Sequence, residues 1–203
     1  MIQASDPANQ TISVALPRFI GLLVTDDQFN ALAEANRDLR LERTAQGELI
    51  VNPPTGGETG KQNWRISGEL YLWWRGAGEP GKGFDSSTGF KLPNGAIRSP
   101  DAAWISDDRW HRLTEKQQSG IVPLCPDFVV ELRSTSDSRS ILQDKMQEYI
   151  DNGAQLGWLI DPLNRRVDIY RLDLSVESLD HPSQLSGEAI LPGFILELQQ
   201  IWE

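Results

Sequence analysis

Two acidic residues and a lysine, far apart in the chain, could together form a hydrolytic site. Asp101 opens a predicted strand, Glu131 lies within an apolar run about thirty residues later, and Lys145 lies in the next predicted helix. Mg²⁺ and Mn²⁺ bind one or two carboxylates together with water and phosphate oxygens. A nearby lysine can orient the attacking water or offset negative charge that develops on phosphorus. The three residues therefore predict a metal-dependent phosphodiesterase site.

Each of these residues also has a structural interpretation. Asp101 could be a turn or cap residue after a proline. Glu131 could form an ion pair with Arg98 or Arg133, because a carboxylate in an apolar strand is costly unless it is paired or metal-bound. Lys145 could be a solvated residue on the helix surface. The spacing alone leaves these alternatives open.

The segments around these residues predict an α/β domain. Residues 128–132 form an apolar run broken only by Glu131, which indicates a central strand covered on both faces. A helix is expected from Asp137 or Ser138 through Asn152, followed by a buried strand over residues 156–160. A strand, a helix and an adjacent strand form an α/β crossover.

The N-terminal half predicts a helix, a hairpin and a second helix. Thr25 to Gln28 reads as a capping box that starts a helix ending near Asn36. Strands are expected at residues 39–43 and 48–51, and the second helix follows a loop rich in proline and glycine. The expected apolar face of that second helix consists of Trp64, Ile66, Leu70, Trp73 and Trp74.

Further along, residues 84–92 are expected to form one strand, and residues 188–198 to add one or two edge strands. The division of the chain is an N-terminal arm, residues 1–24, and a single domain, residues 25–203.

Composition limits the function classes. The chain has 203 residues, 39% of them hydrophobic, and no apolar run approaches the roughly 20 residues of a membrane span. No export signal is recognised, so a cytoplasmic location is expected. The net charge of −10 gives little long-range attraction to phosphate. A zinc site or a Ser-His-Asp triad is disfavoured, because the only histidines, His111 and His181, lie in predicted loops. The single cysteine, Cys125, is expected to be buried and inert.

Four segments together resemble successive signature blocks of the Uma2 family, and the resemblance extends from about Thr25 to Trp202. This family is similar to the PD-(D/E)XK nuclease superfamily. The blocks are Pro100-Asp101, residues 126–137, residues 145–149 and residues 153–162.

The resemblance implies a restriction-endonuclease-like fold, in which helices flank a mixed sheet, here with an N-terminal helix and hairpin extension. It also implies endonuclease activity with Mg²⁺ or Mn²⁺, in which Asp101 and Glu131 are the metal ligands. The lysine of the superfamily would fall at Arg133, and arginine cannot serve as a general base. The resemblance implies that in this family the lysine has moved to the following helix, which points to Lys145. A homodimer is expected by analogy.

The superfamily often adds an acidic residue near the first helix. Glu58 is preferred for this role over Glu69, although Glu58 could equally cap its helix. DNA is the first expectation for the substrate, with RNA left open. Two other functions are possible: a nuclease-fold binding or regulatory module with weak or lost activity, and a structural homodimer joined through tryptophan-rich surfaces.

Overall fold

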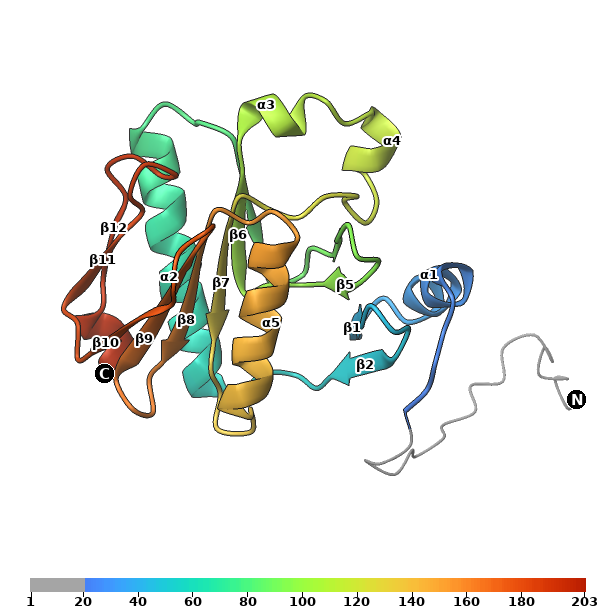
Figure 1. The fold of residues 1–203 in the computed structure, drawn as a ribbon, viewed down its shortest axis with the longest axis horizontal. Coiled ribbons are helices and arrows are strands. Elements are labelled where there is room, and N and C mark those ends of the chain that lie inside the picture. Colours follow the sequence, from blue (N-terminus) through green and yellow to red (C-terminus); the bar gives the residue numbers. More distant parts are fainter. Residues whose placement is uncertain (1–20) are drawn as a thin grey trace, which may run out of the picture.

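The computed structural model describes residues 21–203. These residues form helices and strands in an α/β arrangement (Figure 1). The helices are α1 (Asp26–Ala35), α2 (Gly57–Gly76), α3 (Asp107–Trp110), α4 (Glu115–Gln118), α5 (Arg139–Asp151) and α6 (Gln199–Trp202). The strands are β1 (Arg40–Arg43), β2 (Leu49–Asn52), β3 (Lys82–Asp85), β4 (Phe90–Lys91), β5 (Ile97–Arg98), β6 (Ala102–Ile105), β7 (Phe128–Leu132), β8 (Leu156–Asp161), β9 (Arg166–Arg171), β10 (Glu177–Asp180), β11 (Gln184–Ser186) and β12 (Ile195–Glu197).

A six-stranded mixed sheet forms the centre, in the order β10-β9-β8-β7-β6-β3. The pair β7 and β8 is parallel and is connected through α5, whereas the other neighbours are antiparallel. The helices α2 and α5 cover opposite faces of this sheet (Figure 1). The predicted mixed sheet flanked by helices, with its crossover, is therefore confirmed.

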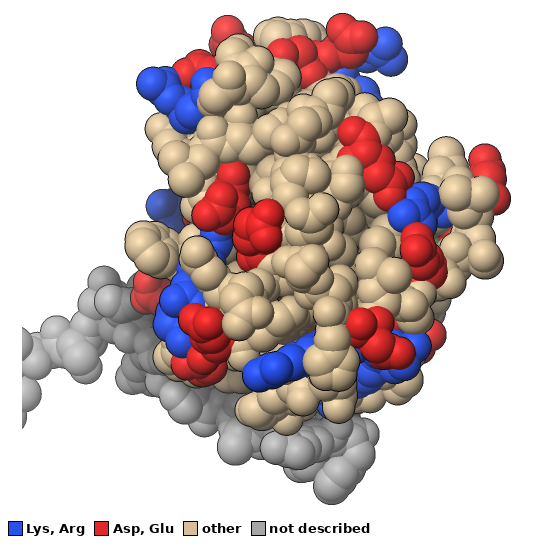
Figure 2. Space-filling model, turned by 90° about the vertical axis from the view of Figure 1, so that its left-hand side faces the viewer, with Lys and Arg blue, Asp and Glu red and all other residues tan. Residues whose placement is uncertain are grey.

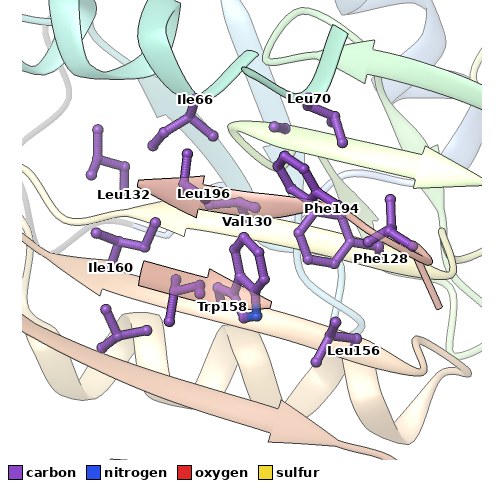
Figure 3. Close-up of a cluster of buried hydrophobic side chains, with 14 of the residues drawn as sticks. Ile66, Leu70, Phe128, Val130, Leu132, Leu156, Trp158, Ile160, Phe194 and Leu196 are labelled. Carbon is purple, nitrogen blue, oxygen red and sulfur yellow. The ribbon is translucent and has the colours of Figure 1, made fainter. Parts of the chain in front are cut away.

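Alternation along β7 divides its side chains between the two faces. Phe128, Val130 and Leu132 point toward α2, where they pack with Ile66 and Leu70 (Figure 3). Val129 lies in the cluster on the opposite face, with residues of α5. Because side chains alternate, Glu131 shares the face of Val129 and points toward α5.

Close packing fixes α5 against this second face. Gly157 on β8 leaves room for the helix: a Cβ atom there would lie 2.5 Å from Cε of Met146 and 3.2 Å from Val129. Met146 and Tyr149 are fully buried in the same cluster. The helix therefore cannot shift or rotate without a clash or a cavity, which sets the positions of its polar side chains as well.

The N-terminal extension follows the predictions. α1 begins with a capping box between Thr25 and Gln28, and β1 pairs antiparallel with β2 as a hairpin. β1 also pairs with β5, which joins the hairpin to a small sheet in the order β2-β1-β5-β4. Of the predicted N-terminal arm, residues 1–20 lie outside the described part of the chain. Val24 is buried, and its N–H donates to the Gly47 carbonyl at 2.8 Å.

Two predictions about element detail are wrong. The side chain of Trp64 is not on the buried face of α2; it is 77% exposed, and Gln62 is buried there instead. Residues 84–92 are not one strand, because the chain turns at Ser87, whose N–H donates to Asp85 Oδ1 at 3.0 Å. This turn places β3 in the central sheet and β4 in the small one.

The C-terminal strands β11 and β12 pair with each other in a separate two-stranded sheet instead of extending the central sheet. Their inward side chains Leu185 and Leu196 complete the core on the α2 side. Among the described residues, no helix is both long enough and apolar enough to cross a membrane.

Candidate active site

Asp101 directly precedes β6 and lies beside Glu131 of the neighbouring strand β7. β6 and β7 pair antiparallel, with Ala102 opposite Val130, and the Asp101 N–H donates to the Val130 carbonyl at 2.9 Å. Continuing this register by one residue places Asp101 opposite Glu131. Residues directly opposite each other in an antiparallel pair share a face of the sheet. Both carboxylates are buried. Two acidic groups that lie thirty residues apart in the sequence are therefore neighbours at the N-terminal end of β6.

The helix α5 adds a lysine and a tyrosine to this pair. Lys145 Nζ lies 2.8 Å from Glu131 Oε1, and the Tyr149 hydroxyl donates to the same oxygen at 2.9 Å. Lys145 and Tyr149 are four residues apart, so they lie on one face of the helix. Lys145 therefore faces the carboxylates and not bulk water, and its side chain is only 12% exposed.

A third carboxylate, Glu42, was not predicted from the sequence. Glu42 Oε1 lies 2.9 Å from Lys145 Nζ and accepts the Ser99 N–H at 3.2 Å, while Oε2 lies 3.4 Å from Arg98. Glu42 comes from β1, where its alternation with Leu41 looks like an ordinary solvent-facing position. Only the docking of the hairpin onto the central sheet buries it, and no local pattern signals that event.

Burial and charge shift the pKa values of the acidic groups in opposite directions. Burial raises the pKa of Glu131 to about 7, against the pull of Lys145, and burial also raises the pKa of Asp101. Although burial alone would raise the pKa of Glu42, the charges of Lys145 and Arg98 hold it below its ordinary value. Glu42 is therefore the ionised partner of Lys145, and Glu131 takes up a proton near neutral pH.

Although burial alone would lower the pKa of Lys145, the carboxylates of Glu131 and Glu42 hold it well above its ordinary value. The ammonium group therefore keeps its proton at neutral pH. It can donate hydrogen bonds and supply positive charge, but it cannot accept a proton from water.

These residues line the inner wall of a cavity of about 190 Å³. Asp101 Oδ2 accepts the Leu132 N–H at 2.8 Å, and Oδ1 accepts Asn63 Nδ2 at 3.1 Å. Arg40 NH1 lies 3.8 Å from the same Oδ1. The outer wall consists of the loop after β2 and the loop between β7 and α5. The lining residues are Arg40, Glu42, Asn52 to Gly56, Thr59, Asn63, Asp101, Glu131, Leu132, Ser134 to Asp137, Leu142 and Lys145.

The structure does not bring every predicted site residue into this cavity. Glu58 lies in the first turn of α2, is 63% exposed and pairs with Lys61 at 2.7 Å. Glu69, farther along α2, does not line the cavity either. Arg133 lies 2.9 Å from Asp161 at the end of β8. Neither predicted arginine partner of Glu131, Arg133 or Arg98, is paired with it; Lys145 is.

The donor set fits a hard divalent cation. Among residues 21–203, no group of three or more His, Cys, Asp or Glu side chains is arranged as a complete metal cage. Mg²⁺ does not require one, because it keeps several waters and binds through one or two carboxylates. Asp101 and Glu131 are two carboxylates that could fill this role. Beside them, Asn63 Oδ1 is buried and accepts no hydrogen bond from any described residue, so the donor set contains one further oxygen with unused acceptor capacity.

Acidic residues outnumber basic residues in the chain. The sequence carries 29 acidic and 19 basic residues. On the face seen in Figure 2, Lys and Arg side chains are scattered among acidic and uncharged ones and do not merge into one basic surface. The net charge of −10 gives little long-range attraction to phosphate.

Comparisons with known proteins identify a family and a similar fold. A family model, Uma2, described as "Putative restriction endonuclease", matches residues 26–199. No curated protein matches the sequence. Among solved structures, the crystal structure of "a putative nuclease belonging to DUF820" from Anabaena variabilis superposes with a TM-score of 0.73 at 20% sequence identity. That match covers 88% of this chain and 97% of the other.

Proposed function

We propose that this chain, which belongs to the Uma2 family, is a metal-dependent nuclease that hydrolyses nucleic-acid phosphodiester bonds in the cavity beside Asp101. The observation that carries the proposal is the pairing of Asp101 and Glu131 on adjacent strands, with Lys145 Nζ 2.8 Å from Glu131. The likeness to the Anabaena structure supports the fold at this sequence identity. The substrate and the metal are inferred from the chemistry of the site.

Asp101 and Glu131 would hold Mg²⁺ or Mn²⁺. When bound, such a cation stabilises the negative charge that develops on phosphorus and promotes ionisation of water. In the reaction, a bond forms between a water oxygen and phosphorus, an ester P–O bond breaks, the water releases a proton and the departing oxygen gains one. Glu131 must lose its own proton before it binds the cation, because a ligand carboxylate is deprotonated.

Lys145 would act as a fixed cation. A lysine has three N–H donors, and two of them are directed at Glu131 and Glu42. The third is available to hydrogen-bond the attacking water or a phosphate oxygen. Tyr149 holds Glu131 through its hydroxyl, so the carboxylate keeps one orientation. Arg133 takes no part in this arrangement because it is engaged by Asp161.

Cleavage of plasmid DNA, single-stranded DNA and RNA with Mg²⁺ or Mn²⁺ tests the proposal. Wild type is expected to cleave at least one substrate in a metal-dependent manner, and Asp101→Asn and Glu131→Gln are expected to lose the activity. Glu58→Gln is the matched carboxylate control and is expected to retain it, because Glu58 lies apart from the cluster and is paired with Lys61. If wild type and variants are equally inert on every substrate, the chain is instead a nuclease-fold binding module.

A homodimer is part of the same proposal. The exposed face of α2 carries large hydrophobic side chains, Trp64, Tyr71 and Leu72, which are each more than half exposed. Apolar groups gathered on one helix are typical of a contact surface. Sedimentation of the wild type and of a Trp64→Ser, Leu72→Ser double variant tests the assignment. A wild type that sediments as a monomer at all concentrations refutes it.

A further inference from the structure

We propose that Arg40 is the residue that binds the substrate phosphate at the mouth of the cavity. This inference rests on the proposed nuclease function and adds to it the group that captures the phosphodiester. Among residues 21–203, the basic side chains that line the cavity are Arg40 and Lys145. They differ in how far their hydrogen-bonding groups are already used.

Lys145 is held between two carboxylates at 2.8 and 2.9 Å. The contacts of Arg40 are long: NH1 lies 3.8 Å from Asp101 Oδ1, and NH2 donates to the Ser99 carbonyl at 3.4 Å. Its Nε is buried and has no hydrogen-bond partner among residues 21–203. The two terminal nitrogens of a guanidinium carry four of its five N–H donors, and in Arg40 they make only these two long contacts, so they can still donate to a phosphate.

The position of Arg40 suits an incoming anion. Arg40 is the first residue of β1 and lies two residues before Glu42, so the two side chains share a face of the strand. Its partner across the hairpin is Asn52, which also lines the cavity. The side chain of Arg40 is 29% exposed, whereas that of Glu42 is 3% exposed. Arg40 thus lies nearer to solvent than Glu42, and a phosphate that enters the cavity from solvent can reach it.

Charge balance gives the same assignment. The inner cavity contains the carboxylates of Glu42, Asp101 and Glu131 against one tightly paired lysine. A phosphodiester that enters brings another negative charge. A guanidinium can offset it with two parallel N–H bonds to phosphate oxygens, which a lysine cannot do. Because the chain carries a net charge of −10, Arg40 would add local attraction for the phosphate to that of the metal ion of the proposed site.

The alternative is that Arg40 only neutralises Asp101. In that case Arg40 would influence folding and the pKa of Asp101, but not the salt dependence of nucleic-acid binding. The two interpretations therefore differ in a measurement that does not depend on catalysis.

Binding of fluorescently labelled single-stranded and duplex oligonucleotides, followed by anisotropy over a range of salt concentrations, tests the inference. The measurements use the full chain with Mg²⁺ on a Glu131→Gln background, so that the probe stays intact. Arg40→Met is expected to weaken binding about tenfold to a hundredfold, the effect of losing a charged hydrogen-bonded contact. The slope of log K against log salt should fall by about 0.7 to 0.9, which corresponds to one phosphate contact.

Two further variants complete the experiment. Arg40→Lys keeps the charge but not the paired donors, so it should keep the salt slope and still bind more weakly than arginine. Arg37→Met is the matched control, because it removes the same charge from an exposed turn three residues away. It should leave affinity and slope unchanged. Thermal unfolding of each variant shows whether it is folded, and if Arg40→Met is unfolded, the Arg40→Lys result decides.

The inference is overturned if a folded Arg40→Met binds the probes with the affinity and salt slope of the parent, or if Arg37→Met weakens binding as much. If the parent binds probe but only the Arg40 prediction fails, the nuclease proposal survives. If the parent binds no nucleic acid and wild type cleaves none, both fail.

Discussion

Replacing Lys145 with methionine would test the electrostatics of the cluster. The change keeps the length and most of the volume of the side chain but removes the ammonium group that lies 2.8 Å from Glu131 and 2.9 Å from Glu42. Glu42 would keep Arg98 at 3.4 Å, and Glu131 would keep the Tyr149 hydroxyl. The buried carboxylates of Glu42 and Glu131 would therefore lose the cation that both of them contact.

The magnitude follows from these distances. At an effective dielectric constant of about 20, each contact contributes roughly 6 kcal/mol of Coulomb attraction, most of which offsets the cost of burying the ions. Removing one member of a buried ion pair typically costs about 3 to 5 kcal/mol. We expect Lys145→Met to lower the free energy of unfolding by that amount at pH 8.

The loss of unfolding free energy caused by Lys145→Met should be smaller at low pH. Burial raises the pKa of Glu131 to about 7, and removal of Lys145 raises it further. The folded variant then binds more protons than folded wild type between about pH 7 and the higher pKa that Glu131 has in the variant. Its stability relative to wild type should therefore increase as the pH falls. At pH 5.5 we expect roughly half of the loss at pH 8.

Urea unfolding at both pH values measures the effect. Lys116→Met, at an exposed position in α4, is the matched control and should stay within about 0.5 kcal/mol of wild type. The reasoning is refuted if Lys145→Met costs less than about 1 kcal/mol at pH 8, or if its cost is the same at both pH values.

Other predictions concern the metal and the packing. Mn²⁺ affinity measured by calorimetry should fall about tenfold per pH unit below pH 7 and level off above it, because Glu131 must release a proton to bind the ion; a flat profile contradicts this. Gly157→Ala should lower stability by about 1 to 3 kcal/mol in urea unfolding, because its Cβ would overlap Met146; a neutral result would mean that α5 can move. Trp64→Ser should change monomer stability by less than about 0.5 kcal/mol, whereas Trp158→Ala, at a fully buried position, should cost about 3 to 5 kcal/mol; similar costs for the two would contradict this difference in burial.

The sequence correctly predicted features that depend on residues close together in the chain. The capping box at Thr25 started α1 as expected, because a cap depends only on residues within one turn. The apolar run around Glu131 formed a strand buried on both faces, as its composition predicts. The family resemblance was confirmed by the match over residues 26–199.

The sequence did not predict features that depend on the packing of elements far apart in the chain. Glu42 lies within 2.9 Å of Lys145, 103 residues away, and its strand pattern is that of an ordinary hairpin. Trp64 has the apolar character of a core residue, but the orientation of α2 is set by Ile66 and Leu70, which leaves Trp64 exposed. Glu58 had suggestive glycine neighbours, yet the helix directs Thr59 and Asn63, not Glu58, into the cavity.

The central claim is that Asp101 and Glu131 together hold a hard cation. The most direct measurement is a crystal structure of the protein soaked with Mn²⁺, with anomalous diffraction used to locate the metal. The account predicts a Mn²⁺ peak in contact with both carboxylates, lost in crystals of Glu131→Gln. A peak elsewhere, or none beside these two residues while Lys145 remains paired with Glu131, would contradict it.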